Sequence, residues 1–276
     1  MNPLFVSAHG ARIPSIGLGT WQLTGDTGFE AVKAALVAGY RHLDTAAAYQ
    51  NEVEVGAGLK ASGLLRSEVW VTTKVWWDQI DDGPLQASAE ASLKRLGLSE
   101  VDLLLIHWPN PEIPLARSIR ALNAVRRSGL ARHIGVSNFT LPLLAEAVRL
   151  SEAPLVVNQC EYHPRLDQSK LIAACAANGM AFVGYTPLGR GSLMDDPVIS
   201  AIARAKGVTS GQVILRWHVQ QGTVAIPRSS NPARTAENIN LWHFSLDAAE
   251  MAAITALRAP DGRLVKPAFA PQWDAA

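Results

Sequence analysis

Cysteine is scarce in this chain, and so are long apolar runs. Only Cys160 and Cys175 occur among 276 residues, and two thiols in a chain of this size are typical of a reducing compartment, not of a disulfide scaffold. No apolar run is long enough to span a bilayer, and the first residues, MNPLFVSAHGARIP, lack the charged-then-apolar pattern of a secretory signal. We therefore expect a cytoplasmic protein with free, buried cysteines and no membrane contact.

The chain also lacks an excess of charge and a recognisable metal or nucleotide loop. Its 25 basic and 24 acidic residues give a net charge of +1, so no general basic field favours nucleic acid. Its seven histidines are scattered without the HExxH or HxH spacing of zinc ligands, so we expect no metal site. His42, His133 and His163 are interpreted as structural.

One glycine cluster superficially resembles a phosphate-binding loop. Gly56-Ala57-Gly58 is followed by Gly63, as in a dinucleotide fingerprint. However, the cluster lies inside a helical pattern, whereas the fingerprint requires a strand before it and a helix after it. The sequence therefore argues against a Rossmann site.

Short apolar runs alternate with longer amphipathic segments along nearly the whole chain. Eight runs are predicted to be strands: 15–19, 41–44, 69–74, 101–107, 133–137, 155–159, 180–185 and 223–227. The helices expected between them cover 27–39, 51–63, 84–97, 118–129, 141–150, 168–179 and the region 195–222. This alternation predicts a parallel sheet. Eight repeats without a linker favour closure into a (β/α)8 TIM barrel.

The two ends of the chain fall outside this pattern. We expect a small N-terminal hairpin that turns at His9-Gly10 and plugs the barrel bottom. The stretch from about Arg258 to Ala276 has no periodicity and is expected to form a loop over the barrel mouth. Since no linker divides the chain, residues 1–276 are interpreted as a single domain.

Four polar residues follow the first apolar runs. Asp44 ends the second run and Tyr49 lies just beyond it, Lys74 ends the third run and His107 ends the fourth. Charged groups at such positions are costly to bury without a reason, and strand ends carry the active site of barrel enzymes. A cationic Lys74 beside Tyr49 is expected to favour the phenolate and lower the tyrosine pKa, with Asp44 orienting the lysine. These residues predict a proton donor, and His107 a hydrogen-bond donor to a carbonyl oxygen.

Each of these residues alone could equally be structural, since an Asp–Lys pair is often only a salt bridge. A Schiff-base aldolase that uses Lys74 is a further alternative, although a neighbouring Asp44 would keep the lysine charged and poorly nucleophilic.

Several segments resemble the aldo-keto reductase family. The stretch GYRHLDTAAAYQNEVEVG (39–56) is similar to its first signature and RHIGVSNF (132–139) to its second, while IPRS (226–229) resembles the cofactor end, where Arg228 stands at a position that is usually lysine. Shorter matches are GLGTW, TTKVW, LLLIHWP, NQCEYHP and YTPLGRG. The likeness extends from about Gly17 to Asn238 and is greatest to the bacterial diketogluconate and methylglyoxal reductase branch.

The resemblance implies hydride transfer from NADPH to a small-molecule carbonyl, with Tyr49 as proton donor, Asp44 and Lys74 tuning it, and His107 orienting the substrate. It also implies contacts to the nicotinamide carboxamide from Ser137, Asn138 and Gln159, and stacking of Tyr185 on the ring. Gly19, Thr20 and Asp44 are further residues expected to contact the cofactor, and Leu188 and Gly189 would lie along its pyrophosphate. The family's usual state is a monomer, although some of its relatives are regulatory subunits that bind NADPH with little turnover.

The phosphate end can be argued from the residues themselves. Ser229, Ser230 and Asn231 precede a proline, as at a helix start. With Arg228 and Arg234 nearby, such a helix start predicts an anion site that suits the 2′-phosphate of NADPH. Glu237 and Asn238 match family positions near the adenine.

Tryptophans that follow strand ends are candidates for an apolar substrate mouth. Trp21, Trp76 and Trp108 are expected to contact the substrate beside Tyr49 and His107, and Trp77 and Trp273 are weaker candidates.

Overall fold

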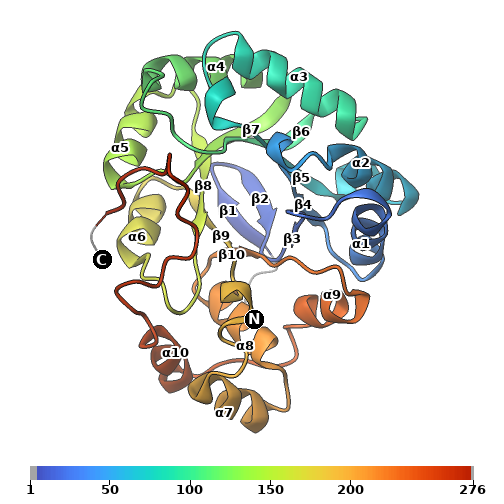
Figure 1. Ribbon diagram of the computed structural model, residues 1–276, viewed down its shortest axis with the longest axis vertical. Coiled ribbons are helices and arrows are strands. Elements are labelled where there is room, and N and C mark those ends of the chain that lie inside the picture. Colours follow the sequence, from blue (N-terminus) through green and yellow to red (C-terminus); the bar gives the residue numbers. More distant parts are fainter. Residues whose placement is uncertain (1–4, 275–276) are drawn as a thin grey trace.

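A ring of eight parallel strands forms the centre of the computed structural model, which describes residues 5–274 (Figure 1). The strands are β3 (Leu18–Gly19), β4 (His42–Asp44), β5 (Trp70–Val75), β6 (Val101–Ile106), β7 (Ala131–Ser137), β8 (Leu155–Glu161), β9 (Ala181–Tyr185) and β10 (Val224–Ile226). Each of them coincides with a predicted run, so the expected strand set is confirmed.

The strands are paired in chain order and the ring closes between its first and last members. Every neighbouring pair from β3 to β10 is parallel. The Gly17 amide donates to the Ala225 carbonyl at 2.9 Å, and the Ala225 amide donates to Ser15 at 2.9 Å. These bonds leave no free sheet edge, and the predicted (β/α)8 barrel is confirmed.

Helices cover the outside of the ring (Figure 1). They are α1 (Gly25–Val37), α2 (Glu52–Ala61), α3 (Pro84–Leu96), α4 (Leu115–Arg127), α5 (Leu141–Leu150), α6 (Ser169–Ala177), α7 (Pro197–Lys206), α8 (Ser210–Gln220), α9 (Pro232–Ile239) and α10 (Ala248–Thr255). The region 195–222 contains two helices, because Gly207 adopts a left-handed conformation and Thr209 caps a new helix. Helix α10 was not expected from the sequence.

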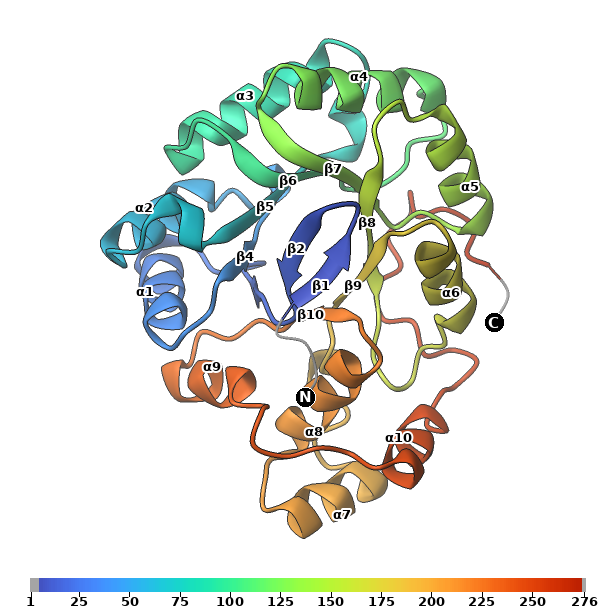
Figure 2. The same ribbon diagram turned by 180° about the vertical axis from the view of Figure 1, so that it is seen from behind.

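Residues 5–14 form the expected hairpin of β1 (Phe5–Ala8) and β2 (Ala11–Pro14), which turns at His9-Gly10 with positive φ at both. Ala8, Ala11 and Ile13 pack in one apolar cluster with barrel residues that include Leu105 and Val157. Figure 2 shows the hairpin inside the ring at the end opposite the C-terminal tail. The hairpin therefore closes the barrel bottom and leaves the other end for a site.

The glycines of the superficial phosphate loop serve helix packing. Gly56 and Gly58 lie within α2, where a Cβ atom on Gly56 would be 2.1 Å from the Leu96 carbonyl oxygen and one on Gly58 would be 2.8 Å from Val32. Both positions need glycine because helices α1 and α3 approach this closely, which agrees with the rejection of a Rossmann site.

Of the expectations from composition, the one for free, buried cysteines is confirmed. Among residues 5–274, no helix is both long and apolar enough to cross a membrane. Cys160 and Cys175 are buried and free. Burial raises the pKa of the Cys160 thiol to about 12, so this thiol is unreactive at neutral pH.

The segment after α10, which we call the C-terminal tail (residues 256–274), contains no helix or strand in its described part. It lies along one side of the open end of the barrel, over α6 and beside β8 (Figure 1), and residues 264–267 and 269 line the cavity there. The last two residues of the predicted loop lie outside the described residues. Gly262 permits this path, because a Cβ atom there would be 1.9 Å from the carbonyl oxygen of Arg165.

Candidate active site

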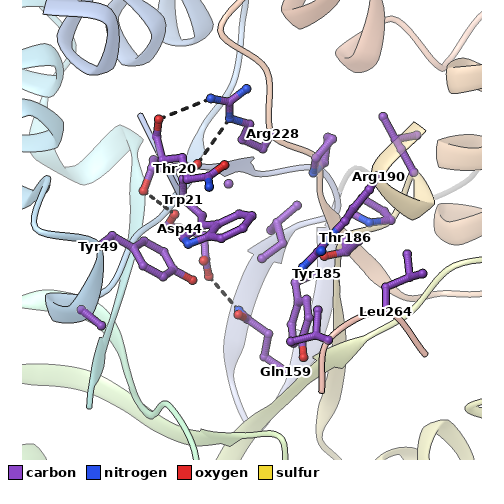
Figure 3. A pocket seen from close by; sticks show the side chains of 18 of the residues that line it. Thr20, Trp21, Asp44, Tyr49, Gln159, Tyr185, Thr186, Arg190, Arg228 and Leu264 are labelled. Atoms are coloured by element: carbon purple, nitrogen blue, oxygen red, sulfur yellow. Dashed lines mark hydrogen bonds between the residues drawn. The ribbon is translucent and has the colours of Figure 1, made fainter. Parts of the chain in front are cut away.

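The carboxyl ends of the strands surround a cavity of about 1360 Å³ at the barrel mouth (Figure 3). Its lining includes residues that are predicted for catalysis, for cofactor binding and for substrate binding. They are Gly19, Thr20, Trp21, Asp44, Tyr49, Trp76, His107, Trp108, Asn138, Gln159, Tyr185, Leu188, Arg228, Ser229, Ser230, Arg234, Glu237 and Asn238. Lys74, Ser137, Gly189, Trp77 and Trp273 lie outside this lining. The cavity is continuous from Tyr49 to Asn238.

Lys74 is bound below the cavity by three oxygen atoms. Its Nζ donates to Asp44 Oδ1 at 2.5 Å, to the Thr45 carbonyl at 2.8 Å and to the Tyr49 hydroxyl at 3.4 Å. The other Asp44 oxygen accepts from Gln159 Nε2 at 2.7 Å (Figure 3). Burial by itself lowers the pKa of Lys74, but the charge of Asp44 and the Tyr49 contact outweigh it, so the pKa is raised and the lysine stays cationic.

Tyr49 ends a short 3-10 helix, η1 (Ala47–Tyr49), which follows β4. The loop is fixed by Asn51, a buried residue that sequence reasoning passed over. Its Nδ2 donates to the carbonyls of Thr20 at 2.7 Å and Leu23 at 2.9 Å, and its Oδ1 accepts from Thr45 Oγ1 at 2.8 Å. An asparagine directly after the tyrosine loop was the only signal for it.

The expected lowering of the Tyr49 pKa is wrong. Burial raises the pKa of the phenol, and Asp44 raises it further, while the Lys74 charge opposes both without overcoming them. The sign differs because desolvation penalises the phenolate more than a single lysine that is already paired with a carboxylate can favour it. Tyr49 is therefore a neutral phenol at neutral pH and carries a proton to donate.

His107 lies beside Tyr49, with ring centroids 5.6 Å apart, and also packs against Trp76. Burial, reinforced by the Lys74 charge, holds the pKa of His107 well below 6.5. Among residues 5–274, its Nδ1 has no hydrogen-bond partner. A neutral imidazole carries one N–H, so His107 is able to donate one hydrogen bond into the cavity.

Asn138, Tyr185 and Ser137 form a linked group at the ends of β7 and β9. Asn138 has a left-handed backbone with φ of 63°, its Nδ2 donates to the His107 carbonyl at 3.0 Å, and its Oδ1 accepts from the Tyr185 hydroxyl at 2.8 Å. Ser137 is buried and donates to the Gln159 carbonyl at 2.8 Å. Thus Asn138, Gln159 and Tyr185 face the cavity, whereas Ser137 supports them from behind.

At the far end of the cavity, α9 begins as predicted, with Asn231 as its cap and Pro232 in the first turn. Asn231 Oδ1 already accepts from the amides of Ala233 and Arg234, so these two amides are not free for an anion, and Arg228 and Arg234 are the charged donors at this end. Arg228 donates to the carbonyls of Trp21 and Gln22, both at 3.3 Å (Figure 3). These two bonds join the loop after β10 to the loop after β3.

The residues present fit a dinucleotide. One end of the cavity has amide side chains and an aromatic ring, which suit a nicotinamide, and the other has two arginines, which suit phosphate. Glu237 and Asn238 line this second end together with Gly211. Among the residues described, no group of three or more His, Cys, Asp and Glu side chains could hold a metal ion.

An aromatic cluster lines the mouth near His107. Phe269, from the C-terminal tail, packs edge-on against Trp76 at 5.5 Å and Trp108 at 5.6 Å, and it stacks on Trp77 at 4.9 Å between ring centroids. Trp273 contacts the outer side of Trp108. Phe269 was not predicted, because the tail has no periodicity that indicates which side chain turns inward.

Trp21 forms a separate part of the rim. It is 47% exposed, and the Arg190 guanidinium lies 5.7 Å from the centroid of its ring. Trp21 and Arg190 thus face each other across the cavity (Figure 3).

Known proteins share this sequence and architecture. The model of the aldo/keto reductase family matches residues 15–259. Methylglyoxal reductase DkgB of Escherichia coli is 39% identical over 266 residues, which cover 95% of this chain and 99% of that protein. A crystal structure of a putative 2,5-diketo-D-gluconic acid reductase B has a TM-score of 0.96 and 42% identity, covering 98% of both chains. A Bombyx mori aldo-keto reductase in complex with NADP has a TM-score of 0.88 and 36% identity, covering 94% of both. This chain belongs to the aldo/keto reductase family.

Proposed function

We propose that the protein reduces small aldehydes, α-ketoaldehydes or keto sugars to alcohols, with NADPH as the hydride source. One observation carries the proposal: a neutral Tyr49 hydroxyl, hydrogen-bonded to a buried cationic Lys74, lies beside a neutral His107 in the cavity. This combination suits protonation of a carbonyl oxygen that gains negative charge.

The chain's own residues have distinct parts in this reaction. When bound, NADPH supplies a hydride to the carbonyl carbon. His107 donates a hydrogen bond to the carbonyl oxygen and orients it, and the Tyr49 hydroxyl gives its proton to the same oxygen, which completes the alcohol. The phenolate left on Tyr49 lies next to the Lys74 ammonium, which stabilises it until a proton returns. Asp44 keeps Lys74 charged and aimed at Tyr49.

The cofactor assignment rests on the basic end of the cavity. Arg228 and Arg234 both line it, and two guanidinium groups suit the extra 2′-phosphate that distinguishes NADPH from NADH. The Bombyx mori relative, whose structure is a complex with NADP, supports this choice. At the other end, Asn138 and Gln159 offer amide groups to the nicotinamide carboxamide, and Tyr185 offers a ring face.

The substrate class rests on the aromatic mouth and on the relatives. Trp76, Trp108 and Phe269 leave an apolar entrance around His107, which suits small carbonyl compounds. The names methylglyoxal reductase and 2,5-diketo-D-gluconic acid reductase support adjacent dicarbonyls and keto sugars as substrates.

A Schiff-base aldolase is a weaker reading of the same site. The Lys74 side chain is fully buried, has three oxygen partners and has a raised pKa. An amine that is charged and enclosed in this way is a poor nucleophile. Borohydride treatment with a carbonyl substrate should therefore leave Lys74 unmodified.

The experiment that tests the proposal is an assay of methylglyoxal, a keto sugar acid and an aromatic aldehyde, with NADPH and NADH in parallel. We expect carbonyl-dependent oxidation of NADPH, with NADH much less effective. If NADPH binds tightly but no carbonyl compound is reduced, the proposed turnover is wrong and a regulatory subunit is favoured.

A further inference from the structure

A buried carboxylate at the end of β8 has no part in the reaction described above. Glu161 is 0% exposed, and it is the last residue of the strand that also carries Gln159. Residues two apart on a strand face the same side, so Gln159 and Glu161 lie on the same face of β8. Gln159 binds Asp44, whereas Glu161 has other partners.

Most of the partners of Glu161 come from the C-terminal tail. Oε1 accepts from the Leu264 amide at 2.7 Å, and Oε2 accepts from the Val265 amide at 3.0 Å. The Arg263 guanidinium lies 3.9 Å from Oε2. The remaining contact is His163 Nε2 at 3.1 Å from Oε1. Three consecutive tail residues therefore bind one side chain that lies about a hundred residues earlier in the chain.

These contacts lie next to the cavity. Leu264 and Val265 line it, and Phe269 reaches the tryptophans around His107 only four residues later. On the outer side, the guanidinium of Arg263 lies 3.5 Å from the ring centroid of Trp273, which packs against Trp108. The position of the tail at Glu161 thus determines where Phe269 and Trp273 meet the substrate entrance.

We propose that Glu161 is a positioning residue that fastens the C-terminal tail over the cavity and thereby sets, through Phe269, the size of carbonyl substrate that the site accepts. The part that concerns substrates rests on the proposed function; the fastening of the tail does not.

A carboxylate is required by the geometry of the partners. Two backbone N–H groups point at its two oxygens, and an ionised carboxylate accepts at both. A glutamine has one acceptor oxygen and one donor NH2, so one tail amide would face another donor. Hydrogen bonds to an ionised carboxylate are also stronger than bonds to a neutral amide. Glu161→Gln should therefore loosen the tail while leaving the side-chain shape nearly unchanged.

The fastening is tested by amide hydrogen exchange at Leu264, Val265 and Phe269. We expect exchange in Glu161→Gln to be faster than in the parent protein by about tenfold or more at these amides. Exchange at the β6 amides, the control segment, should stay unchanged. Glu152→Gln is the matched control, because it removes an exposed carboxylate that pairs with Arg127. Unchanged exchange at Leu264 and Val265 in Glu161→Gln would overturn the proposal.

A second variant covers the case in which Glu161→Gln fails to fold. Arg263→Ala removes the tail's ion pair and its Trp273 contact but keeps the buried carboxylate and both amide bonds. We expect a smaller acceleration of exchange, of a few fold at the same amides. No acceleration in this variant would contradict the role assigned to the Arg263 contacts.

The substrate part is tested by the ratio of kcat/KM for a bulky aromatic aldehyde to that for methylglyoxal. Glu161→Gln and Phe269→Ala should shift this ratio in the same direction, by about fivefold or more, with the effect mainly in KM. The Kd for NADPH should stay within about twofold. A loosened tail with an unchanged ratio would overturn the specificity role alone. If the parent protein reduces neither aldehyde, the proposed function fails, while the exchange result still decides the fastening.

Discussion

The Lys74 ammonium and the Asp44 carboxylate form an enclosed ion pair, with Nζ 2.5 Å from Oδ1 and side-chain exposures of 0% and 2%. Enclosed pairs of this kind contribute little net stability in general, but removal of one partner leaves an uncompensated buried charge. Here the same pair also supports Tyr49 and Gln159, so the pair connects the stability of the barrel mouth with the proposed chemistry.

Asp44→Asn should therefore lower the free energy of unfolding by about 3–5 kcal/mol, because Lys74 would remain buried without its counterion. Urea unfolding followed by tryptophan fluorescence measures this loss. Glu152→Gln, which removes an exposed carboxylate, should change stability little. Equal effects of the two substitutions would contradict the importance of the enclosed pair.

Tyr49→Phe should reduce kcat by about 10²–10⁴-fold, since it removes the proton donor and nothing else of similar size. NADPH binding, followed by fluorescence titration, should be nearly unchanged because the aromatic ring remains. Turnover within a few fold of the parent protein would rule out Tyr49 as the donor.

The rate of carbonyl reduction should vary little with pH across the neutral range. Tyr49 must be protonated, and burial raises its pKa above 10, so the acid form persists until the solution is more alkaline than that. His107 must be neutral in the proposed role, and its pKa lies well below 6.5, so mild acid does not protonate it. A plot of kcat/KM with NADPH should be flat from about pH 6.5 to 9. A fall centred near pH 7 would show that one of these groups titrates there.

The two arginines at the basic end should discriminate between cofactors. Arg228→Ala and Arg234→Ala together should weaken NADPH by roughly 10²-fold or more and NADH much less, since each charge-assisted bond to a phosphate contributes about 1.5–3 kcal/mol. Isothermal titration with both cofactors measures this difference. Equal losses for NADPH and NADH would exclude a role in 2′-phosphate recognition.

Comparison of the single variants refines the same test. Arg228 already donates to two backbone carbonyls, so its removal should also affect the β3–α1 loop and the exposure of Trp21. Arg234 has no such bond among those observed in residues 5–274. We therefore expect Arg234→Ala to give the purer change in cofactor preference.

Much of the fold and the site follows from the order of residues along the chain. Strand periodicity, helix stops and the absence of a linker were enough to predict eight strands, and side chains at the ends of parallel strands necessarily meet at one end of a barrel. Asp44, Lys74 and His107 are brought together for this reason. The helical setting of Gly56 and Gly58 and the cap at Asn231 were also predictable, because helix pattern and capping are local features of the chain.

Other features depend on contacts between distant segments. The direction of the Tyr49 pKa results from competition between desolvation and two opposite charges, and only the depth of burial decides it. Asn51 and Phe269 act through partners far away in sequence, and the tail that carries Phe269 has no periodic pattern. The four polar residues, with the strands that present them, were determined by the sequence. Which of them hold a proton, and how Glu161 fixes the tail above them, was decided by the tertiary structure, because burial and electrostatic energy depend on the whole packed environment.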